Sequence, residues 1–257
     1  MQESLLEVNN LSKSFGGVKA VSDLSFTVNR GQIKAMIGPN GSGKTTVFNL
    51  ISGLQHPDKG EKKLKERAFD GLKPHEVAAL GISRTFQNVL IFDNLTVCQN
   101  VMVGRHTQSK GDFLRSGLGF SWVRKQEKAI QEAASKTLEL VGLASKADEM
   151  AGNLPYGEQK LLEVARAMAT EPELLMLDEP AAGLNEKETG DMADIIRSLQ
   201  KTGVTILLVE HDMSIVMEIS EDIVVLNYGV KIAEGTPGSI QENPMVIEAY
   251  LGEEIDV

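Results

Sequence analysis

The stretch Gly38-Pro-Asn-Gly-Ser-Gly-Lys-Thr45 decides the fold of this chain. It fits the pattern G-x-x-x-x-G-K-[ST], a loop that wraps nucleotide phosphates. The apolar run 33–37 before it predicts a buried strand, and residues 46–52 after it predict a helix. Glycines let successive N–H groups point into one nest, and a helix N-terminus adds positive potential there. The strand–loop–helix order therefore predicts a phosphate-binding loop.

The last two residues of the motif predict the chemistry of the loop. Lys44 is expected to reach the β- and γ-phosphates of a nucleotide, and the Thr45 hydroxyl is expected to hold Mg²⁺. A glycine-rich turn without a ligand is the alternative interpretation. The motif on its own does not decide between the two, so the rest of the chain has to.

Composition sets the broad class. The 257 residues are 42% hydrophobic and 24% charged, which suits one large α/β domain or two small ones. The net charge of −10, from 36 acidic and 26 basic residues, argues against nucleic-acid binding through a broad basic face. Cys98 has no partner for an intrachain disulfide and is expected to be a small buried residue. With neither a signal peptide nor a membrane-length apolar run, we expect a soluble protein, which leaves a membrane partner open.

Strand and helix patterns alternate on both sides of a helical middle. Strands are predicted at 5–8, 18–28, 80–86, 174–178 and 204–209, with a late hairpin at 223–226 and 230–233. Helices are predicted at 124–143, 157–170, 186–200 (with Asn185 as N-cap) and 213–219. The middle, from about 94 to 152, is interpreted as a helical insertion. The apolar residues from Phe113 to Trp122 are expected to pack within it, with contact to a partner as the alternative. The charge run 61–67 is predicted to be a solvated face.

Two carboxylates end the apolar strand at 174–178. Asp178 is expected to bind Mg²⁺ beside Thr45, directly or through water. Glu179 is expected to lie near the γ-phosphate and to accept a proton from the attacking water. An acidic pair that caps the next helix is the structural alternative. The phosphate loop in the same chain favours the catalytic interpretation.

Two further polar residues follow predicted strands. His211 comes after the strand 204–209, and Gln87 comes after the strand 80–86. Ligands of parallel sheets gather at the carboxyl ends of strands, so both side chains are expected at the same edge as Glu179. A neutral amide such as that of Gln87 suits the orientation of water or the binding of Mg²⁺.

The order of these features over nearly the whole chain resembles the ATPase subunit of ABC transporters. The family has an aromatic A-loop, Walker A, Q-loop, signature, Walker B with a glutamate, D-loop and H-loop. Here these correspond to Phe15, Gly38–Thr45, Gln87, Leu154–Gln159, Leu174–Glu179, Ala182–Asn185 and His211. Seven elements in the family order are far more specific than any one of them.

The resemblance implies an ATP site shared by two subunits, with ATP and Mg²⁺ as ligands. The catalytic residues it implies are Glu179, His211, Lys44 and Gln87, and the metal ligands are Thr45, Gln87 and Asp178. The nucleotide-binding residues of the same chain are Phe15, Val21, Gly38, Pro39, Asn40, Gly41, Ser42, Gly43, Lys44, Thr45 and Thr46. The residues offered to the nucleotide of the second subunit are Pro155, Tyr156, Gly157 and Glu158.

The implied fold is α/β: a P-loop NTPase with a RecA-like parallel core, an antiparallel β-subdomain and an inserted α-helical subdomain. All of 1–257 forms one ABC ATPase domain, with the core and β-subdomain at about 1–87 and 166–257 and the helical subdomain at about 88–165. The implied partners are a second ABC ATPase subunit, identical or not, and transmembrane permease subunits. No nucleic acid is expected. The implied location is peripheral, on the cytoplasmic face of the inner membrane.

The residues of these motifs resemble those of one subgroup, the ATPase of branched-chain amino-acid uptake systems. The segments that carry this are Leu154–Gln159, Ala181–Asn185 and Gly81–Asn88. Pro155 and Tyr156 depart from the common Leu-Ser-Gly-Gly-Gln signature, and proline brings neither a hydroxyl nor an N–H donor. Urea uptake and lipopolysaccharide export are alternatives, as are a soluble non-transport ABC ATPase and a nucleotide-binding module without hydrolysis. The Lys-rich stretch 61–71 departs from the alternating strand of the family, which puts the antiparallel subdomain in question.

Overall fold

The computed structural model of the protein describes residues 3–106 and 120–251. Its centre is a six-stranded sheet in the order β10-β9-β3-β8-β7-β6. The strands are β3 (Ile33–Ile37), β6 (Ile82–Arg84), β7 (Leu174–Asp178), β8 (Thr205–Val209), β9 (Asp222–Asn227) and β10 (Val230–Gly235). All neighbours are parallel except β9 and β10, which form the predicted hairpin. Every residue of β3, β7 and β8 is buried, as expected for parallel strands covered on both faces.

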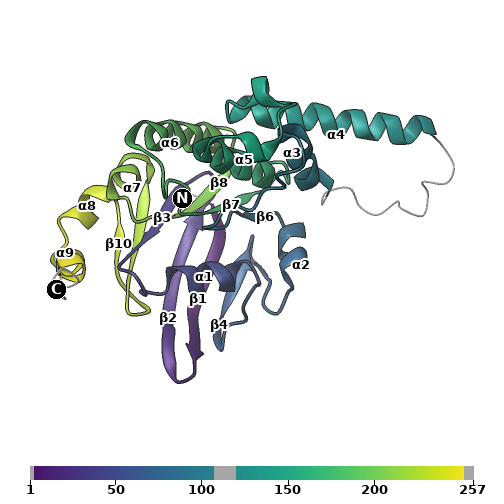
Figure 1. Ribbon diagram of the computed structural model, residues 1–257. Helices are drawn as coiled ribbons and strands as arrows, with labels where there is room; N and C mark the ends of the chain where they lie inside the picture. The colour runs from purple at the N-terminus through teal and green to yellow at the C-terminus, as the bar shows by residue number, and fades with distance from the viewer. Residues whose placement is uncertain (1–2, 107–119, 252–257) are drawn as a thin grey trace.

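A second, antiparallel sheet lies below the first and has the order β2-β1-β4-β5 (Figure 1). Its strands are β1 (Ser4–Phe15), β2 (Val18–Asn29), β4 (Lys59–Leu64) and β5 (Arg67–Ala68). The antiparallel subdomain therefore forms despite the Lys-rich stretch. The prediction of a solvated charge run at 61–67 is wrong for Lys62, which is 1% exposed.

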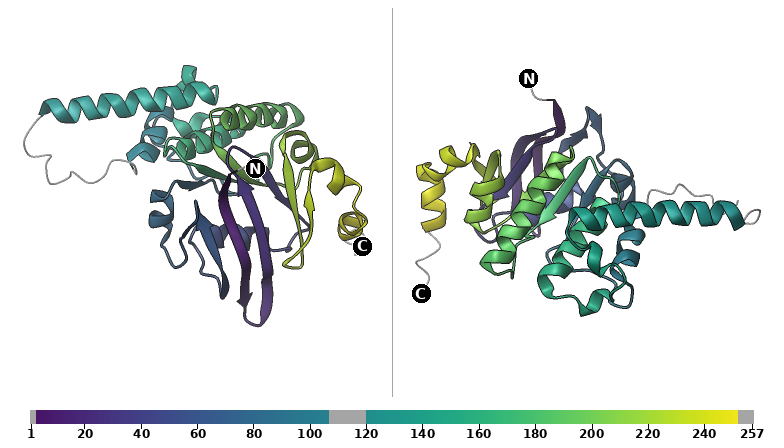
Figure 2. Two further views of the ribbon diagram at one scale, coloured as in Figure 1. Left: turned by 180° about the vertical axis from the view of Figure 1, so that it is seen from behind. Right: turned by 90° about the horizontal axis from the view of Figure 1, so that it is seen from above.

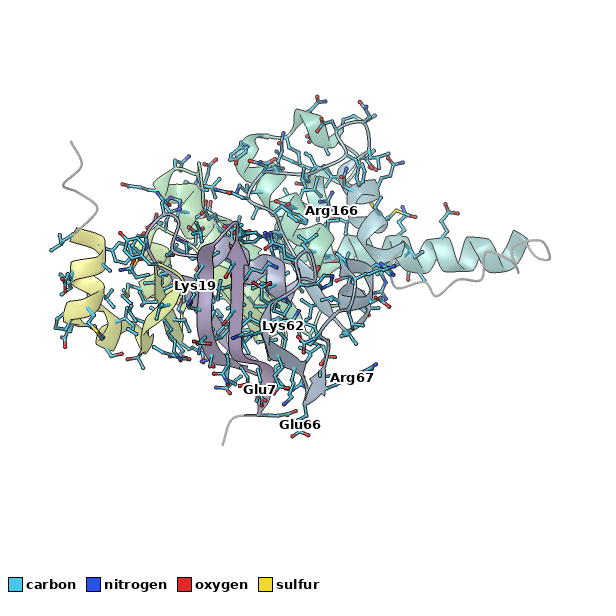
Figure 3. All side chains as sticks on the ribbon, turned by 90° about the horizontal axis from the view of Figure 1, so that it is seen from below. Glu7, Lys19, Lys62, Glu66, Arg67 and Arg166 are labelled. Carbon is cyan, nitrogen blue, oxygen red and sulfur yellow. The ribbon has the colours of Figure 1, made fainter. Side chains whose placement is uncertain are left out.

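Strand alternation explains the burial of Lys62. Lys62 and Leu64 share the inner face of β4, while Glu61 and Lys63 lie on the outer face. The Lys62 ammonium donates to the carbonyl of Leu50 at 2.6 Å and lies 4.8 Å from the centroid of the Phe69 ring. Seen from below, Lys62 lies among the strands of this sheet (Figure 3). Because its stem is apolar and its head finds a carbonyl, a lysine takes a core position here.

Helix α1 (Lys44–Ile51) fills the space between the two sheets. One apolar cluster joins its residues Val47, Phe48, Leu50 and Ile51 to both sheets. The opposite face of the central sheet is covered by α5 (Tyr156–Met168), α6 (Glu186–Lys201) and α7 (Met213–Ile219) (Figure 2). The short helices α8 (Pro237–Gln241) and α9 (Pro244–Leu251) pack beside β9 and β10. The start of α1 thus lies at the carboxyl edge of the sheet.

The predicted helical insertion consists of α3 (Val97–His106), α4 (Phe120–Leu140) and α5, with two short 3-10 turns at Ala144–Lys146 and Ala151–Asn153. Its own apolar cluster contains Val101, Leu138 and Leu162, and Cys98 is buried there as expected. Residues of α5 belong both to this cluster and to the cluster under the central sheet. The boundary predicted near 165 therefore falls inside one helix. The prediction for Phe113 to Trp122 concerns side chains outside the described residues.

Most element boundaries follow the sequence pattern closely. Strand β7, helix α7 and the Asn185 N-cap of α6 are where they were predicted, and the Asn185 side chain accepts from the N–H of Glu188 at 3.0 Å. Strand β6 is shorter than predicted, so Gln87 lies three residues beyond its end. The remaining short helix, α2 (Pro74–Ala79), leads into β6. Within residues 3–106 and 120–251, no helix combines the length and apolarity that crossing a membrane demands.

Candidate functional site

The phosphate loop lies between β3 and α1 with three glycines in the left-handed region. Their φ angles are 148° at Gly38, 76° at Gly41 and 106° at Gly43. A Cβ at Gly38 would lie 2.0 Å from the Leu226 carbonyl oxygen, and a Cβ at Gly43 would lie 2.5 Å from that of Ala20. Both positions therefore require glycine for space as well as for conformation.

Polar groups of the loop are arranged for an anion. The Lys44 ammonium folds back onto the carbonyls of Gly38, at 2.6 Å, and Pro39, at 2.9 Å. The Ser42 hydroxyl is buried and has no hydrogen-bond partner among the described residues. The first turn of α1 contains no acidic residue, so its positive end is not neutralised there. A buried orphan hydroxyl beside a lysine and helix N–H groups fits a phosphate.

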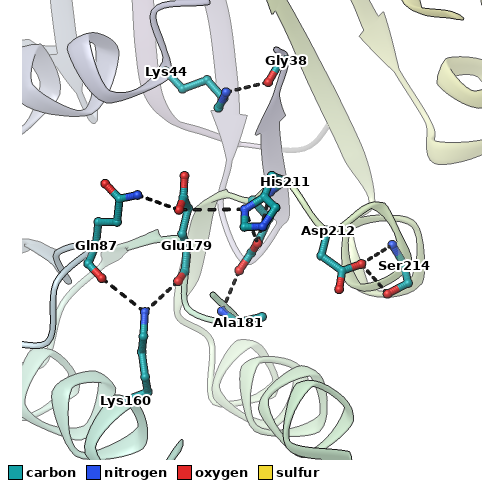
Figure 4. A network of polar contacts seen from close by, with 10 residues as sticks. Gly38, Lys44, Gln87, Lys160, Glu179, Ala181, His211, Asp212 and Ser214 are labelled. Atoms are coloured by element: carbon teal, nitrogen blue, oxygen red, sulfur yellow. Dashed lines mark hydrogen bonds and ion pairs between the residues drawn. The ribbon is translucent and has the colours of Figure 1, made fainter. Parts of the chain in front are cut away.

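Three residues predicted at the carboxyl edge come together at Glu179 (Figure 4). The Gln87 amide Nε2 donates to Glu179 Oε2 at 2.9 Å, and His211 Nδ1 lies 3.9 Å from the same oxygen. The His211 side chain is 61% exposed and that of Glu179 is 19% exposed. The carboxylate is thus fixed by neighbours while the site stays open to solvent.

The backbone of Glu179 explains how two successive carboxylates face one edge. Glu179 has φ 49°, a left-handed conformation that costs a non-glycine residue roughly 1 kcal/mol. Its N–H donates to the Val209 carbonyl at 2.9 Å, and its own carbonyl accepts from the Lys160 ammonium at 2.9 Å. The chain therefore turns sharply at Glu179 and breaks the alternation of β7.

Asp178 forms an ion pair with Arg84, a residue that the sequence analysis did not select. Its Oδ2 accepts from the Arg84 guanidinium at 2.6 Å, and both side chains are less than a tenth exposed. The same guanidinium donates to the Asn49 side chain at 2.7 Å. Asn49 lies one turn after Thr45 on α1. Arg84 thus joins the end of β7 to the face of α1 that carries Thr45.

Glu210 is a second residue that sequence reasoning missed. It is fully buried, and its Oε1 accepts from the N–H of Ala181 at 2.7 Å. Its Oε2 accepts from the N–H of His211 at 3.2 Å. Burial raises the pKa of Glu210, while these backbone donors favour the charged form. The Glu210 carboxylate therefore ties the start of the turn 181–185 to the main chain of His211.

The residues predicted to serve a second subunit lie at the N-terminus of α5. Pro155 is the N-cap, and Pro155 and Tyr156 are both exposed. The Tyr156 ring covers Gly183, where a Cβ would lie 3.1 Å from Cε1. Glu158 forms an ion pair with Lys146, and this partner raises the pKa of Lys146. This helix end therefore faces outward beside the turn 182–185.

The residues predicted around the base of a nucleotide differ in exposure. Phe15, at the end of β1, is 45% exposed, and the Lys13 ammonium lies 5.5 Å from its ring centroid. Val21 is buried, with Cγ2 3.6 Å from the point where a Cβ on Gly43 would lie. Thr45 is exposed at the first turn of α1, and Thr46 is half-buried. The Phe15 ring and the Thr45 side chain are therefore both accessible to a ligand.

A groove of about 490 Å³ lies where the segment after Gln87 meets α3 and α5. Leu90 and Phe92 line it and are about half exposed. Glu163, which is buried, and Arg166 also line the groove. Burial raises the pKa of Glu163 and lowers the pKa of Arg166. The Glu163 carboxylate accepts from the N–H of Phe86 at 3.1 Å, so it anchors the start of the segment that contains Gln87.

The residues that the sequence missed share one property. Arg84, Lys160 and Glu210 act through partners that are distant in the chain or in the main chain itself. Their only sequence signal is a charged residue within or beside an apolar element. The run 174–178 and the loop 38–45, by contrast, carry their chemistry in consecutive residues.

Comparisons with known proteins identify the family. Residues 21–182 match the family described as ABC transporter, and residues 230–256 match the one described as branched-chain amino acid ATP-binding cassette transporter. The chain is 46% identical to the high-affinity branched-chain amino acid transport ATP-binding protein BraF of Pseudomonas aeruginosa, over 98% of this chain and all of that protein. It is 47% identical to LivG of Escherichia coli strain K12, of the same description, with the same coverage.

Solved structures give the same result for the fold. A nucleotide-free ATP-binding cassette from an ABC transporter is 33% identical, with a TM-score of 0.84, and the match covers 96% of this chain and 98% of that one. The ADP conformation of an ATP-binding cassette is also 33% identical, with a TM-score of 0.85 and coverage of 97% and 99%. The predicted P-loop NTPase fold is confirmed. The chain belongs to the ABC transporter family, as an ATP-hydrolysing cassette of the branched-chain amino acid group.

Proposed function

We propose that this chain is the ATP-hydrolysing motor subunit of an ABC importer for branched-chain amino acids. The observation that carries the mechanism is the cluster of Gln87, Glu179 and His211 at the sheet edge where the phosphate loop ends. The cargo rests on the names of relatives that match nearly the whole chain at 46–47% identity. In this proposal the cargo crosses through the membrane partner, so no residue of the cassette is assigned to it.

ATP is proposed to bind with its phosphates in the loop Gly38–Thr46 and its adenine stacked on Phe15. Val21 would be an apolar neighbour of the adenine. Lys44 would leave the carbonyls of Gly38 and Pro39 for the β- and γ-phosphates, since phosphate oxygens carry full charge and carbonyls only a partial one. Ser42 would gain the partner that its buried hydroxyl lacks within the described residues. Asn40 and Gly41 complete the rim of the loop.

Thr45, Gln87 and Asp178 are proposed to hold Mg²⁺ together with the nucleotide. Their oxygens are the hard ligands that this ion prefers. Arg84 occupies only one oxygen of Asp178, so Oδ1 stays available. When bound, the ion neutralises developing charge on the phosphates.

Hydrolysis is proposed to use Glu179 as the general base. A water in line with the γ-phosphate would lose its proton to the Glu179 carboxylate as its oxygen bonds to phosphorus and the bond to the β-phosphate oxygen breaks. Gln87 holds the carboxylate through Nε2, and His211 would steady the water and the γ-phosphate. Lys44 and the loop N–H groups would stabilise the transferred charge, which is catalysis by position and electrostatics.

A complete site is proposed to need two chains. Pro155, Tyr156, Gly157 and Glu158 would meet the γ-phosphate bound by the second ATPase subunit, identical or not. The N–H groups of Gly157 and Glu158 supply the donors there, because Pro155 has none. Closure by ATP and release after hydrolysis would drive the transport cycle.

The membrane partner is proposed to dock in the groove beside Gln87. Half-exposed Leu90 and Phe92 offer apolar contact, and Glu163 ties the groove to the Gln87 segment. A permease segment in this groove would place the chain peripherally, on the cytoplasmic face of the inner membrane. No nucleic acid is involved in this proposal.

The variant Glu179→Gln tests the proposed function. It keeps the shape of the side chain but removes the proton acceptor, so turnover should fall by roughly 10²- to 10⁴-fold while ATP still binds. An ATP-bound dimer should accumulate, which size-exclusion chromatography with ATP and Mg²⁺ would detect. Normal phosphate release by this variant would remove Glu179 from the role of base.

A further inference from the structure

Lys160 is a buried cation that the mechanism above does not use. It lies on the second turn of α5 and is 2% exposed. Its ammonium donates to the main-chain carbonyl of Glu179 at 2.9 Å and lies 3.4 Å from that of Gln87 (Figure 4). One side chain of the helical layer therefore holds the backbone of two residues of the catalytic edge.

The cost of this burial suggests a purpose beyond packing. A buried ammonium loses its hydration, and its hydrogen-bond partners here are main-chain carbonyls, with charge attraction added by the buried Glu163 carboxylate one turn further along α5. The neighbouring positions on α5, Leu161 and Leu162, show that this helix packs apolar side chains readily. A Met or Leu at 160 would fill the space without the charge.

The main chain that Lys160 holds is strained. Glu179 is left-handed, its N–H donates to the Val209 carbonyl, and its own carbonyl accepts from the Lys160 ammonium. The Gln87 side chain bonds the Glu179 carboxylate while the Gln87 carbonyl faces the same ammonium. Lys160, Gln87 and Glu179 thus form a closed ring, so a shift of Lys160 moves the carboxylate.

We propose that Lys160 is a positioning residue that couples the N-terminus of α5 to Glu179 of the same chain. That helix end begins at Tyr156, one turn before Lys160, and the Tyr156 ring lies 5.8 Å from the Lys160 ammonium. The inference rests on the proposed function, in which the same helix end engages the ATP of the second subunit. When α5 engages the ATP of the second subunit, Lys160 would position Glu179 to hydrolyse the ATP of its own chain. The two sites would then hydrolyse ATP together.

The test compares three variants of the full chain, purified with its second ATPase subunit. Lys160→Met should lower kcat at least roughly tenfold, because a displacement of about 1 Å at the base has effects of that order or larger. The Hill coefficient for ATP should fall toward 1, while ATP affinity measured without Mg²⁺ stays within about twofold. Lys160→Arg, which keeps the donors, should recover part of both quantities.

Lys62→Met is the matched control. Lys62 is also a fully buried lysine whose ammonium donates to a main-chain carbonyl, but it lies under the end of α1. Its loss should change thermal stability without changing the Hill coefficient. A merely structural role of Lys160 would make the two variants alike, with activity falling only in proportion to the unfolded fraction, and that result would overturn the inference.

Glu179→Gln, assayed in parallel, separates this inference from the proposed function. If Glu179→Gln is inactive while Lys160→Met keeps the natural kcat and Hill coefficient, only the coupling role of Lys160 is wrong. If Glu179→Gln turns over normally, the proposed base is wrong and the coupling falls with it. A natural chain with a Hill coefficient near 1 also contradicts the coupling.

Discussion

The phosphate loop and the start of α5 are both helix N-termini at the edge of the same sheet, yet they are built differently. The first turn of α1 follows a left-handed Gly43 and contains no acidic residue, and Lys44 lies across the loop. The first turn of α5 follows Pro155 and contains Glu158; Tyr156 is exposed and the residues after it are half-buried. One terminus is enclosed by its own chain, whereas the other faces outward.

This difference indicates that the two helix termini have separate roles in a shared ATP site. An enclosed loop can bind the phosphates before any partner arrives, because its donors are already oriented. An outward helix end gains its ligand only when a second surface brings one. Changes in the loop should therefore affect binding by a single chain, and changes near α5 should affect turnover only.

The largest expected effect is that of Gly38→Ala. The new Cβ would meet the Leu226 carbonyl at 2.0 Å, so the loop must shift. A strain of about 3 kcal/mol would weaken ATP binding about 100-fold, which calorimetric titration would measure. Gly142→Ala is the control, because Gly142 is also left-handed but has nothing within 4 Å of a Cβ. Unchanged ATP affinity in a folded Gly38→Ala protein would break the comparison.

Tyr156→Ala should have the next largest effect and should sharpen the contrast. The Tyr156 ring covers Gly183, so its loss frees both segments that face outward. We expect kcat to fall about tenfold with ATP affinity nearly unchanged, in a phosphate-release assay. Leu140→Ala, another exposed apolar residue at the end of α4, should leave both quantities alone. A loss of ATP affinity in Tyr156→Ala would show that the two termini are not independent.

Lys62→Met probes the stability of the far end of α1, the helix whose first turn closes the phosphate loop. The variant removes the donor to Leu50 at the last turn of α1 and should cost about 1 kcal/mol of unfolding free energy. Urea denaturation would measure it. Removal of a buried charge works in the opposite direction, so a more stable variant would show that the charge outweighs the hydrogen bond. Lys63→Met, on the outer face of β4, should change stability by less than about 0.5 kcal/mol.

The smallest expected effect is a pH dependence of the free energy of unfolding that is caused by Glu210, which lies beneath the turn 181–185. Burial raises the pKa of Glu210 in the folded protein above the unfolded value of about 4.3. Its contribution to stability is therefore complete below about pH 4.3 and is lost as pH rises through the raised pKa. Glu210→Gln should lack this loss, so its stability relative to the natural chain should improve with pH over that window. Denaturation at several pH values checks this, with Glu139→Gln on the exposed side of α4 as the control; parallel curves would contradict it.

Consecutive residues made much of this molecule predictable. Strand β7, helix α7 and the loop at Gly38 were found because their hydrophobic period or glycine pattern is local. The charge run in β4 was misread, since Lys62 looks like a surface residue until its carbonyl partner on α1 is known. Sequence also gave no reason to select Arg84, whose partner Asp178 is 94 residues away.

The amino-acid sequence alone determined that a phosphate loop follows one buried strand. It also determined that carboxylates end a second strand and that a histidine follows a third, because all of these features depend on neighbouring residues. Only the tertiary structure decided that Arg84 pairs with Asp178 and that Lys160 holds the backbone of Glu179. Those contacts join separate elements, and a buried charge is tolerated only where the fold supplies a partner. The sequence identifies the groups of the site, and the pairing of β6 with β7 together with the packing of α5 on the sheet brings them together.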